Sequence, residues 1–205
     1  MSGRTKPCQL IRTHRRAYLV INACVYGAVL LGMAIGMLFP ELHAARADGF
    51  TRSQGDLLLA VFRDPLLFTG TILVVNVLRT AVLLIVLPSL VIPFAGLVVF
   101  GIKTIDMGII LAPVDRVGAL TLIPHSLTLL IEFQAYVWVI FGVWLLGRAW
   151  IRPVAVGAPT HRQGYLAGLR ALGWTWLPAL VLFVIGAIYE VAEIHLLMPL
   201  VLGAA

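Results

Sequence analysis

Long apolar stretches separated by short polar segments dominate the chain. Five stretches are expected to be membrane-spanning helices, at residues 18–39, 66–90, 94–112, 121–146 and 174–198. A helix needs about 20 apolar residues to cross the hydrocarbon layer of a bilayer, and each stretch is near that length. Residues 17–205 are therefore predicted to form a single all-α, polytopic membrane bundle behind a basic cytoplasmic tail at residues 1–16.

The division of residues 66–112 depends on a proline-rich turn and on charge. Pro88, Pro93 and Gly96 lie near the middle of this apolar stretch, where they favour a tight turn between two spans. A single crossing would place the arginine-rich segment 148–170 outside the cell, against the positive-inside rule. With two crossings, the N-terminus is predicted inside and the C-terminus outside.

Composition agrees with a lipid solvent. Hydrophobic residues make up 61% of the 205 residues and charged residues 12%, with a mean hydropathy of +1.02, so a multi-pass protein of the cell (inner) membrane is expected. No stretch remains for a soluble catalytic domain. The net charge of +6 comes from basic segments without interleaved aromatic residues, which excludes a nucleic-acid surface. Cys8 and Cys24 lie in different environments, so no disulfide is predicted.

Two segments are candidates for contacts with other helices or proteins. Gly32 and Gly36 form a small-xxx-small pair that allows close helix approach, although glycine is also frequent in membrane helices generally. The mixed-charge segment from Pro40 to Pro65 is expected on the outer side. Its last part is predicted with equal weight as a short interfacial helix or as an ordinary loop.

Polar residues within the predicted spans are the main candidate site residues. Ionisable groups at membrane depth cost roughly 2.5 to 3.5 kcal/mol each, so they normally face other helices and find partners. Lys103 and Asp106 are spaced for an internal ion pair, and the last span carries Glu193 close to a second glutamate. The candidates are Asn76, Arg79, Lys103, Asp106, His125, Glu132 and Glu190.

These residues allow two interpretations. In the first, Arg79 and Lys103 neutralise Asp106 and Glu132 in a buried structural network. In the second, the polar groups line a cavity that binds an ion or a lipid headgroup, or relays protons. The sequence contains no HExxH metal motif, no GxSxG elbow and no phosphate-binding loop, so no enzyme activity, metal or cofactor is predicted.

Three segments across residues 60–200 resemble the stage II sporulation protein M family of integral membrane proteins. Asn76 resembles an asparagine of the family pattern before a Gly-rich turn, and Pro124 with His125 resembles its Pro-His-Gly motif, followed by a glutamate at Glu132. The segment GAIYEVAEIHLLMP is similar to the last helix of the family and would place Glu190. The chain departs from the pattern at Ser126, Leu129, Lys103 and Thr104.

The resemblance implies a non-enzymatic, multi-spanning scaffold. In spore formers, the family member holds peptidoglycan-degrading enzymes at the septal membrane, so cell-envelope proteins would be the expected partners besides the lipid bilayer. The alternative is a transport or permease subunit that uses the polar residues of spans two to five.

Overall fold

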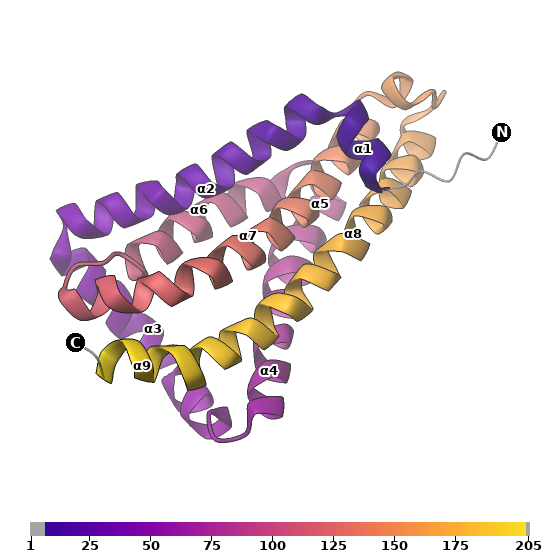
Figure 1. Cartoon of the computed structure of the whole chain (residues 1–205). Helices are drawn as coiled ribbons and strands as arrows, with labels where there is room; N and C mark the ends of the chain where they lie inside the picture. The colour runs from indigo at the N-terminus through magenta and orange to yellow at the C-terminus, as the bar shows by residue number, and fades with distance from the viewer. Residues whose placement is uncertain (1–6, 204–205) are drawn as a thin grey trace.

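The computed structural model describes residues 7–203, except the side chain of residue 58, and these residues form an all-α bundle (Figure 1). The predicted fold class is therefore confirmed. Residues 1–6 of the predicted basic tail and residues 204–205 lie outside the described part. The elements are α1 (Pro7–Thr13), α2 (Arg15–Leu38), α3 (Pro40–Val61), α4 (Pro65–Leu73), η1 (Val74–Val86), α5 (Leu87–Val91), α6 (Ala95–Ile110), α7 (Arg116–Ile151), η2 (Pro153–Val156), α8 (His161–Ala192), η3 (Glu193–Leu197) and α9 (Met198–Gly203).

Four helices within residues 7–203 are long and apolar enough to cross a membrane. They are α2, the continuous helix 65–91 made of α4, η1 and α5, then α7, and the continuous helix 161–203 made of α8, η3 and α9. The predicted third span corresponds to α6, which has only 16 residues. At 1.5 Å per residue α6 is roughly 24 Å long, shorter than a typical hydrocarbon core of about 30 Å.

The segment from residue 40 to residue 65 is almost entirely helical. α3 covers 22 residues of this segment. The sequence left open whether its last part is a short interfacial helix or a loop, and the structure shows a helix up to Val61. The chain then turns at residues 62–64. Asp64 caps α4 because its Oδ1 accepts hydrogen bonds from the backbone N–H groups of Leu66 (2.9 Å) and Leu67 (3.1 Å). Pro65 is the first residue of α4, a position where its missing N–H is tolerated.

Two segments are wound as π-helix. In η1, the N–H of Leu87 bonds to the carbonyl of Val82, five residues earlier, and in η3 the N–H of Met198 bonds to the carbonyl of Glu193 in the same way. π-Helical turns widen the helix and occur often at functional sites. Here they change which side chains of the second and last long helices face the bundle.

A tight helical hairpin joins α5 to α6. Phe94 adopts a left-handed backbone conformation (φ 67°). Its ring packs against Gly147 of α7, where a Cβ would collide with the ring. Ser89 Oγ accepts a hydrogen bond from the N–H of Gly96 (2.8 Å) and donates one to the carbonyl of Ile85 (2.8 Å). Gly96 lies so close to Ile85 that any Cβ would collide with the backbone. The chain therefore turns at residues 92–94, at the end of the predicted range from Pro88 to Pro93, while Pro88 itself still belongs to α5.

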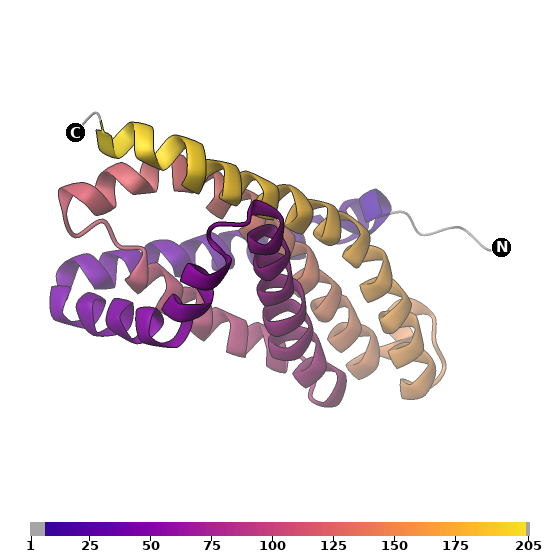
Figure 2. The same cartoon turned by 90° about the horizontal axis from the view of Figure 1, so that it is seen from below.

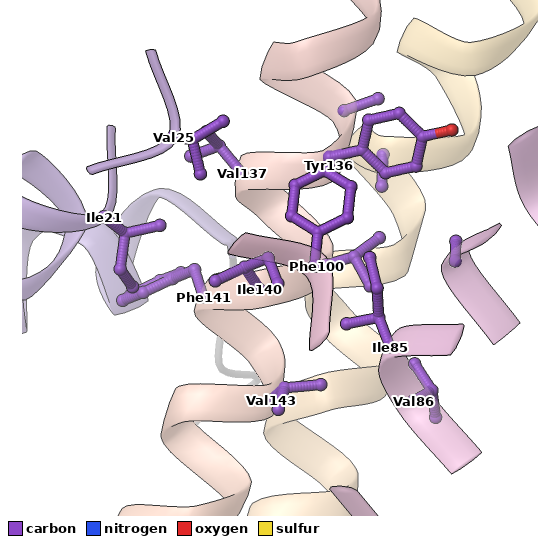
Figure 3. Close-up of a cluster of buried hydrophobic side chains, with 14 of the residues drawn as sticks. Ile21, Val25, Ile85, Val86, Phe100, Tyr136, Val137, Ile140, Phe141 and Val143 are labelled. Carbon is purple, nitrogen blue, oxygen red and sulfur yellow. The ribbon is translucent and has the colours of Figure 1, made fainter. Parts of the chain in front are cut away.

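The core is organised around α7, which packs along α8 on one side and faces α2 and η1 on others (Figures 1 and 2). Figure 3 shows Ile21 and Val25 on one side of α7, and Ile85 and Val86 on the other. The apolar side chains of α7 between them are fully or almost fully buried: Val137, Val139, Ile140, Phe141, Val143 and Leu146.

The two glycines of α2 lie against α6. A Cβ on Gly32 would collide with the carbonyl of Ile105 and lie 2.8 Å from the Cα of Gly108, while a Cβ on Gly36 would lie 2.7 Å from the carbonyl oxygen of Ile109. The close approach is thus made within the chain, between two of its own helices.

Two ends of the bundle differ in charge. One end carries acids and bases side by side, Arg63 with Asp64 and Asp115 with Arg116, and we call it the acidic end because these acids lie there. The end that carries Arg148 and Arg162 has no acidic residue between them, and we call it the arginine-rich end. At the acidic end, His195 Nε2 lies 2.9 Å from the carbonyl oxygen of Phe62, which ties the last long helix to the turn before α4.

Candidate functional site

A polar stripe runs along one face of α7. His125, Thr128, Glu132 and Tyr136 follow one another at three- and four-residue intervals, so their side chains lie on the same side of the helix. Gln134 points elsewhere, toward α2, where its Nε2 donates to Tyr18 Oη (2.6 Å). The stripe therefore faces the second and last long helices.

The middle of the stripe binds side chains from both neighbouring helices. Asn76 of η1 donates from Nδ2 to Glu132 Oε1 (2.6 Å) and accepts at Oδ1 from the Tyr136 hydroxyl (2.9 Å). The carboxyl group of Glu190 on α8 lies close to that of Glu132. The space for this contact comes from Gly186, because a Cβ there would lie 2.8 Å from Glu132 Cγ.

Glu193, the first residue of η3, completes the cluster. Its side chain is 0% exposed, and Oε2 accepts a hydrogen bond from Thr128 Oγ1 (2.5 Å) while Oε1 lies 3.1 Å from His125 Nδ1. We call these seven residues the carboxyl cluster: Asn76, His125, Thr128, Glu132, Tyr136, Glu190 and Glu193.

A cavity of about 370 Å³ reaches the carboxyl cluster from the acidic end. Its lining includes His43 of α3, Asp115 before α7 and Met198 after η3. Along α7, its lining residues run from Val117 to His125, so His125 is the one farthest from the end of the helix. The imidazole thus lies between the cavity and the buried Glu193 carboxyl.

On the opposite side, aromatic rings close the cluster. Tyr136 is buried, and its ring lies 4.8 Å from that of Phe100 and 4.9 Å from that of Phe183, measured between centroids. Figure 3 shows Tyr136 and Phe100 side by side, with Ile140 and Val143 following along the chain toward the arginine-rich end. The cluster therefore has a cavity toward the acidic end and packed apolar side chains toward the other.

Three of the candidate residues lie away from this cluster. Asp106 pairs with Arg46 of α3, with Oδ1 and Nη1 3.2 Å apart, and not with Lys103 as predicted. Arg79 is exposed, and Lys103 is half-buried on α6. The predicted network in which these two cations neutralise Asp106 and Glu132 is therefore wrong for the described residues, because Asp106 is paired with Arg46 and Glu132 Oε1 accepts a hydrogen bond from Asn76.

The remaining candidate, Pro124, lies within α7, next to His125. Its carbonyl oxygen accepts a weak hydrogen bond from the Tyr189 hydroxyl (3.4 Å). A proline inside a helix removes one backbone hydrogen bond, so this part of α7 is held partly by contacts with α8.

Sequence analysis did not select Thr128, Tyr136 or Glu193 as site residues. A signal was present for the first two, since both continue the helical spacing that links His125 to Glu132. Glu193 follows Glu190 by three residues, yet nothing in the sequence indicates that it is the more deeply buried of the two.

The chemistry available to the cluster is that of exchangeable protons. Two carboxyl groups that lie side by side in an apolar bundle repel each other when both are charged, so the Glu132 and Glu190 pair is suited to holding a proton. Among the described residues, no group of three His, Cys, Asp or Glu side chains converges as metal ligands do. The cluster joins three carboxyl groups, an imidazole and hydroxyl groups, which are the groups found in intramembrane proton relays.

Comparison with known proteins gives no relative. The chain matches no family profile, no curated protein and no solved structure.

Proposed function

We propose that the chain is a multi-pass protein of the inner membrane that takes up protons at the carboxyl cluster as a subunit of a transport system. The single observation that supports this proposal most strongly is the gathering of Glu132, Glu190 and Glu193 within otherwise apolar helices. Acidic side chains at that depth carry an energetic cost and are usually found where ions or protons move.

The orientation follows from charge. By the positive-inside rule, the arginine-rich end faces the cytoplasm, and the acidic end with its cavity faces outward. This arrangement requires α6, the predicted third span, to cross the membrane in addition to the four long helices. The N-terminus then lies inside and the C-terminus outside. The cavity then gives outside water access to His125.

The contacts suggest an order for proton movement. A proton taken up by His125 passes to Glu193, whose Oε1 lies 3.1 Å from the imidazole Nδ1. Glu190 and Glu132 receive it next, since the three glutamates lie close enough to influence one another electrostatically. The aromatic contacts of Tyr136 close the path in this state, so release on the cytoplasmic side needs a rearrangement of these rings within the bundle.

Proton flux into liposomes that contain the purified chain tests the proposal. With a membrane potential applied and a pH-sensitive dye inside, the wild-type chain should acidify the lumen faster than protein-free liposomes. Glu132→Gln and Glu190→Gln keep the size of the side chains and should lower this rate at least about tenfold, as expected for the loss of a proton carrier. Glu41→Gln, at an exposed position of α3, is the matched control and should leave the rate unchanged.

Equal flux through the wild-type chain and the Glu132→Gln, Glu190→Gln double variant, both correctly folded, would refute the proposal. So would a wild-type rate no higher than that of protein-free liposomes.

One observation favours the scaffold as a second candidate function. α3 is a 22-residue helix with few buried side chains that lies outside the four long apolar helices, and it presents a mixed-charge surface on the proposed outer side. Together with the resemblance to the sporulation family, this suggests docking of cell-envelope enzymes such as peptidoglycan-remodelling proteins. Crosslinking from single cysteines along α3, in a chain lacking Cys8 and Cys24, should capture such an enzyme. Capture of lipid alone from every position would contradict the scaffold.

A further inference from the structure

Two basic side chains lie on an otherwise apolar outer surface of the bundle. Arg79 is exposed near the middle of the continuous helix 65–91, and Lys103 of α6 lies within its electrostatic range. In Figure 2 this helix stands toward the viewer, on the outside of the bundle. Exposed apolar side chains lie close to these cations along the chain: Leu78 (52%), Leu83 (57%) and Ile102 (66%). We call Leu78, Arg79, Leu83, Ile102 and Lys103 the Arg79 face.

The nine acidic residues of the chain leave these cations without an ion pair, since within residues 7–203 neither Arg79 nor Lys103 forms one with any of them. Asp106, three residues after Lys103 on α6, is close enough to act on it electrostatically, but its carboxylate lies 3.2 Å from Arg46 Nη1. Asp64 and Asp115 cap helices, Asp106 pairs with Arg46, and three glutamates belong to the carboxyl cluster. The other three, Glu41, Asp48 and Asp56, lie on α3.

Lipid headgroups are poor partners at this position. Phosphate groups lie at the membrane surface, whereas Arg79 is roughly 20 Å along the helix from either end. A long basic side chain reaches the surface only from near the end of a span. A charged side chain in the middle of a span normally pairs with an acidic side chain of another helix.

We propose that the Arg79 face binds a transmembrane helix of a different protein, one that carries an aspartate or glutamate in the middle of its span. A second copy of this chain does not fit, because its acids at membrane depth are already bound within their own bundle. The proposal is independent of proton uptake at the carboxyl cluster. That cluster includes Asn76 of the same helix, whose side chain points into the bundle. It predicts a heteromeric complex held partly by an intramembrane ion pair.

Crosslinking in native membranes tests the proposed interface. A photoreactive side chain placed at Leu83, in the full-length chain, should capture one membrane protein that has an acidic residue within a span. Removing both cations, by Arg79→Leu with Lys103→Leu, should lower the captured amount about tenfold or more, as for the loss of one favourable ion pair. Arg52→Leu, at an exposed position of α3, is the matched control and should leave capture unchanged.

Charge reversal separates a specific ion pair from general loss of folding. Arg79→Glu should abolish capture, and changing the acid of the partner to arginine should restore it. Arg79→Lys should retain most of the capture because the charge is kept. The proposal is overturned by capture of phospholipid alone, by capture of a second copy of this chain, or by capture that persists without both cations. A captured protein without an acid in its spans would overturn it as well.

Discussion

Replacement of Glu193 tests whether the carboxyl cluster is a hydrogen-bonded structure or depends on charge. Glu193 is fully buried and bonded to Thr128 and His125. Glu193→Leu has a similar volume but removes both acceptor oxygens. In Glu193→Gln, the amide oxygen still accepts from Thr128, and the amide nitrogen can donate to His125 Nδ1.

The size of the effect follows from the partners left behind. A buried polar group without a partner costs about 1–3 kcal/mol, whereas hydrogen bonds measured within membrane proteins average only about 0.6 kcal/mol. Thr128 can turn its hydroxyl toward the backbone carbonyl four residues earlier, and His125 borders the cavity where water can reach it. Both alternatives favour the lower end of the range, about 1 kcal/mol for each of the two partners, so Glu193→Leu should destabilise the fold by about 2 kcal/mol and Glu193→Gln by less than about 1 kcal/mol.

Unfolding in mixed micelles, with increasing SDS and tryptophan fluorescence as the signal, measures both values. Glu41→Gln, at an exposed position of α3, is the control for a change of charge alone and should be neutral. If Glu193→Gln proved as destabilising as Glu193→Leu, the charge of the carboxylate and not its hydrogen bonds would hold the cluster together. No loss of stability in either variant would refute the packing described for Glu193.

Three further predictions concern other parts of the bundle. Gly32→Ala should be about 1–3 kcal/mol less stable than Gly27→Ala in the same micelle assay, because a Cβ at the first position collides with the backbone of α6 and one at the second meets nothing within 4 Å. His14 has a pKa below its ordinary value of 6.5, owing to burial and to the nearby Arg148 guanidinium. Its folded pKa is depressed, so the unfolded chain takes up the proton more readily, and stability should fall as pH drops through about 6.5; His14→Phe should lack this dependence. Asp106→Asn breaks the ion pair with Arg46, whose two side chains are 39% and 53% exposed. It should therefore lower the free energy of unfolding by less than about 1 kcal/mol, as measured by thermal unfolding.

The long helices could be predicted because apolar length is a property of the sequence itself. α2 begins three residues before the predicted first span and ends one residue before its end, and α7 extends five residues beyond the predicted fourth span on each side, since the polar ends of these spans are still helical. The helix α3 was harder to predict, because its charges are spread around the helix and define no apolar face. The start of the next helix, α4, could be predicted, because Asp64 followed by Pro65 is a common helix start.

The partners within the site could not be predicted, because they depend on the order of helices around the bundle. Charge alone favoured pairing Lys103 with Asp106, three residues apart on α6. The fold instead lays α3 over that helix and brings Arg46 to the carboxylate. The π-helical turns add a second difficulty, since they change the facing of Asn76 and Glu193 by an amount that the residue pattern does not specify.

The bundle separates its acidic and basic side chains where pairing was expected. The glutamates of the last two long helices face inward and bond to an amide, a hydroxyl group and an imidazole. Arg79 and Lys103 lie on other surfaces, without a carboxyl group of this chain bound to them in the described residues. Both proposals start from this separation: proton uptake at the carboxyl cluster, and binding of an acidic side chain of another protein at the Arg79 face. Neither role would be open to a chain whose glutamates and cations neutralised one another.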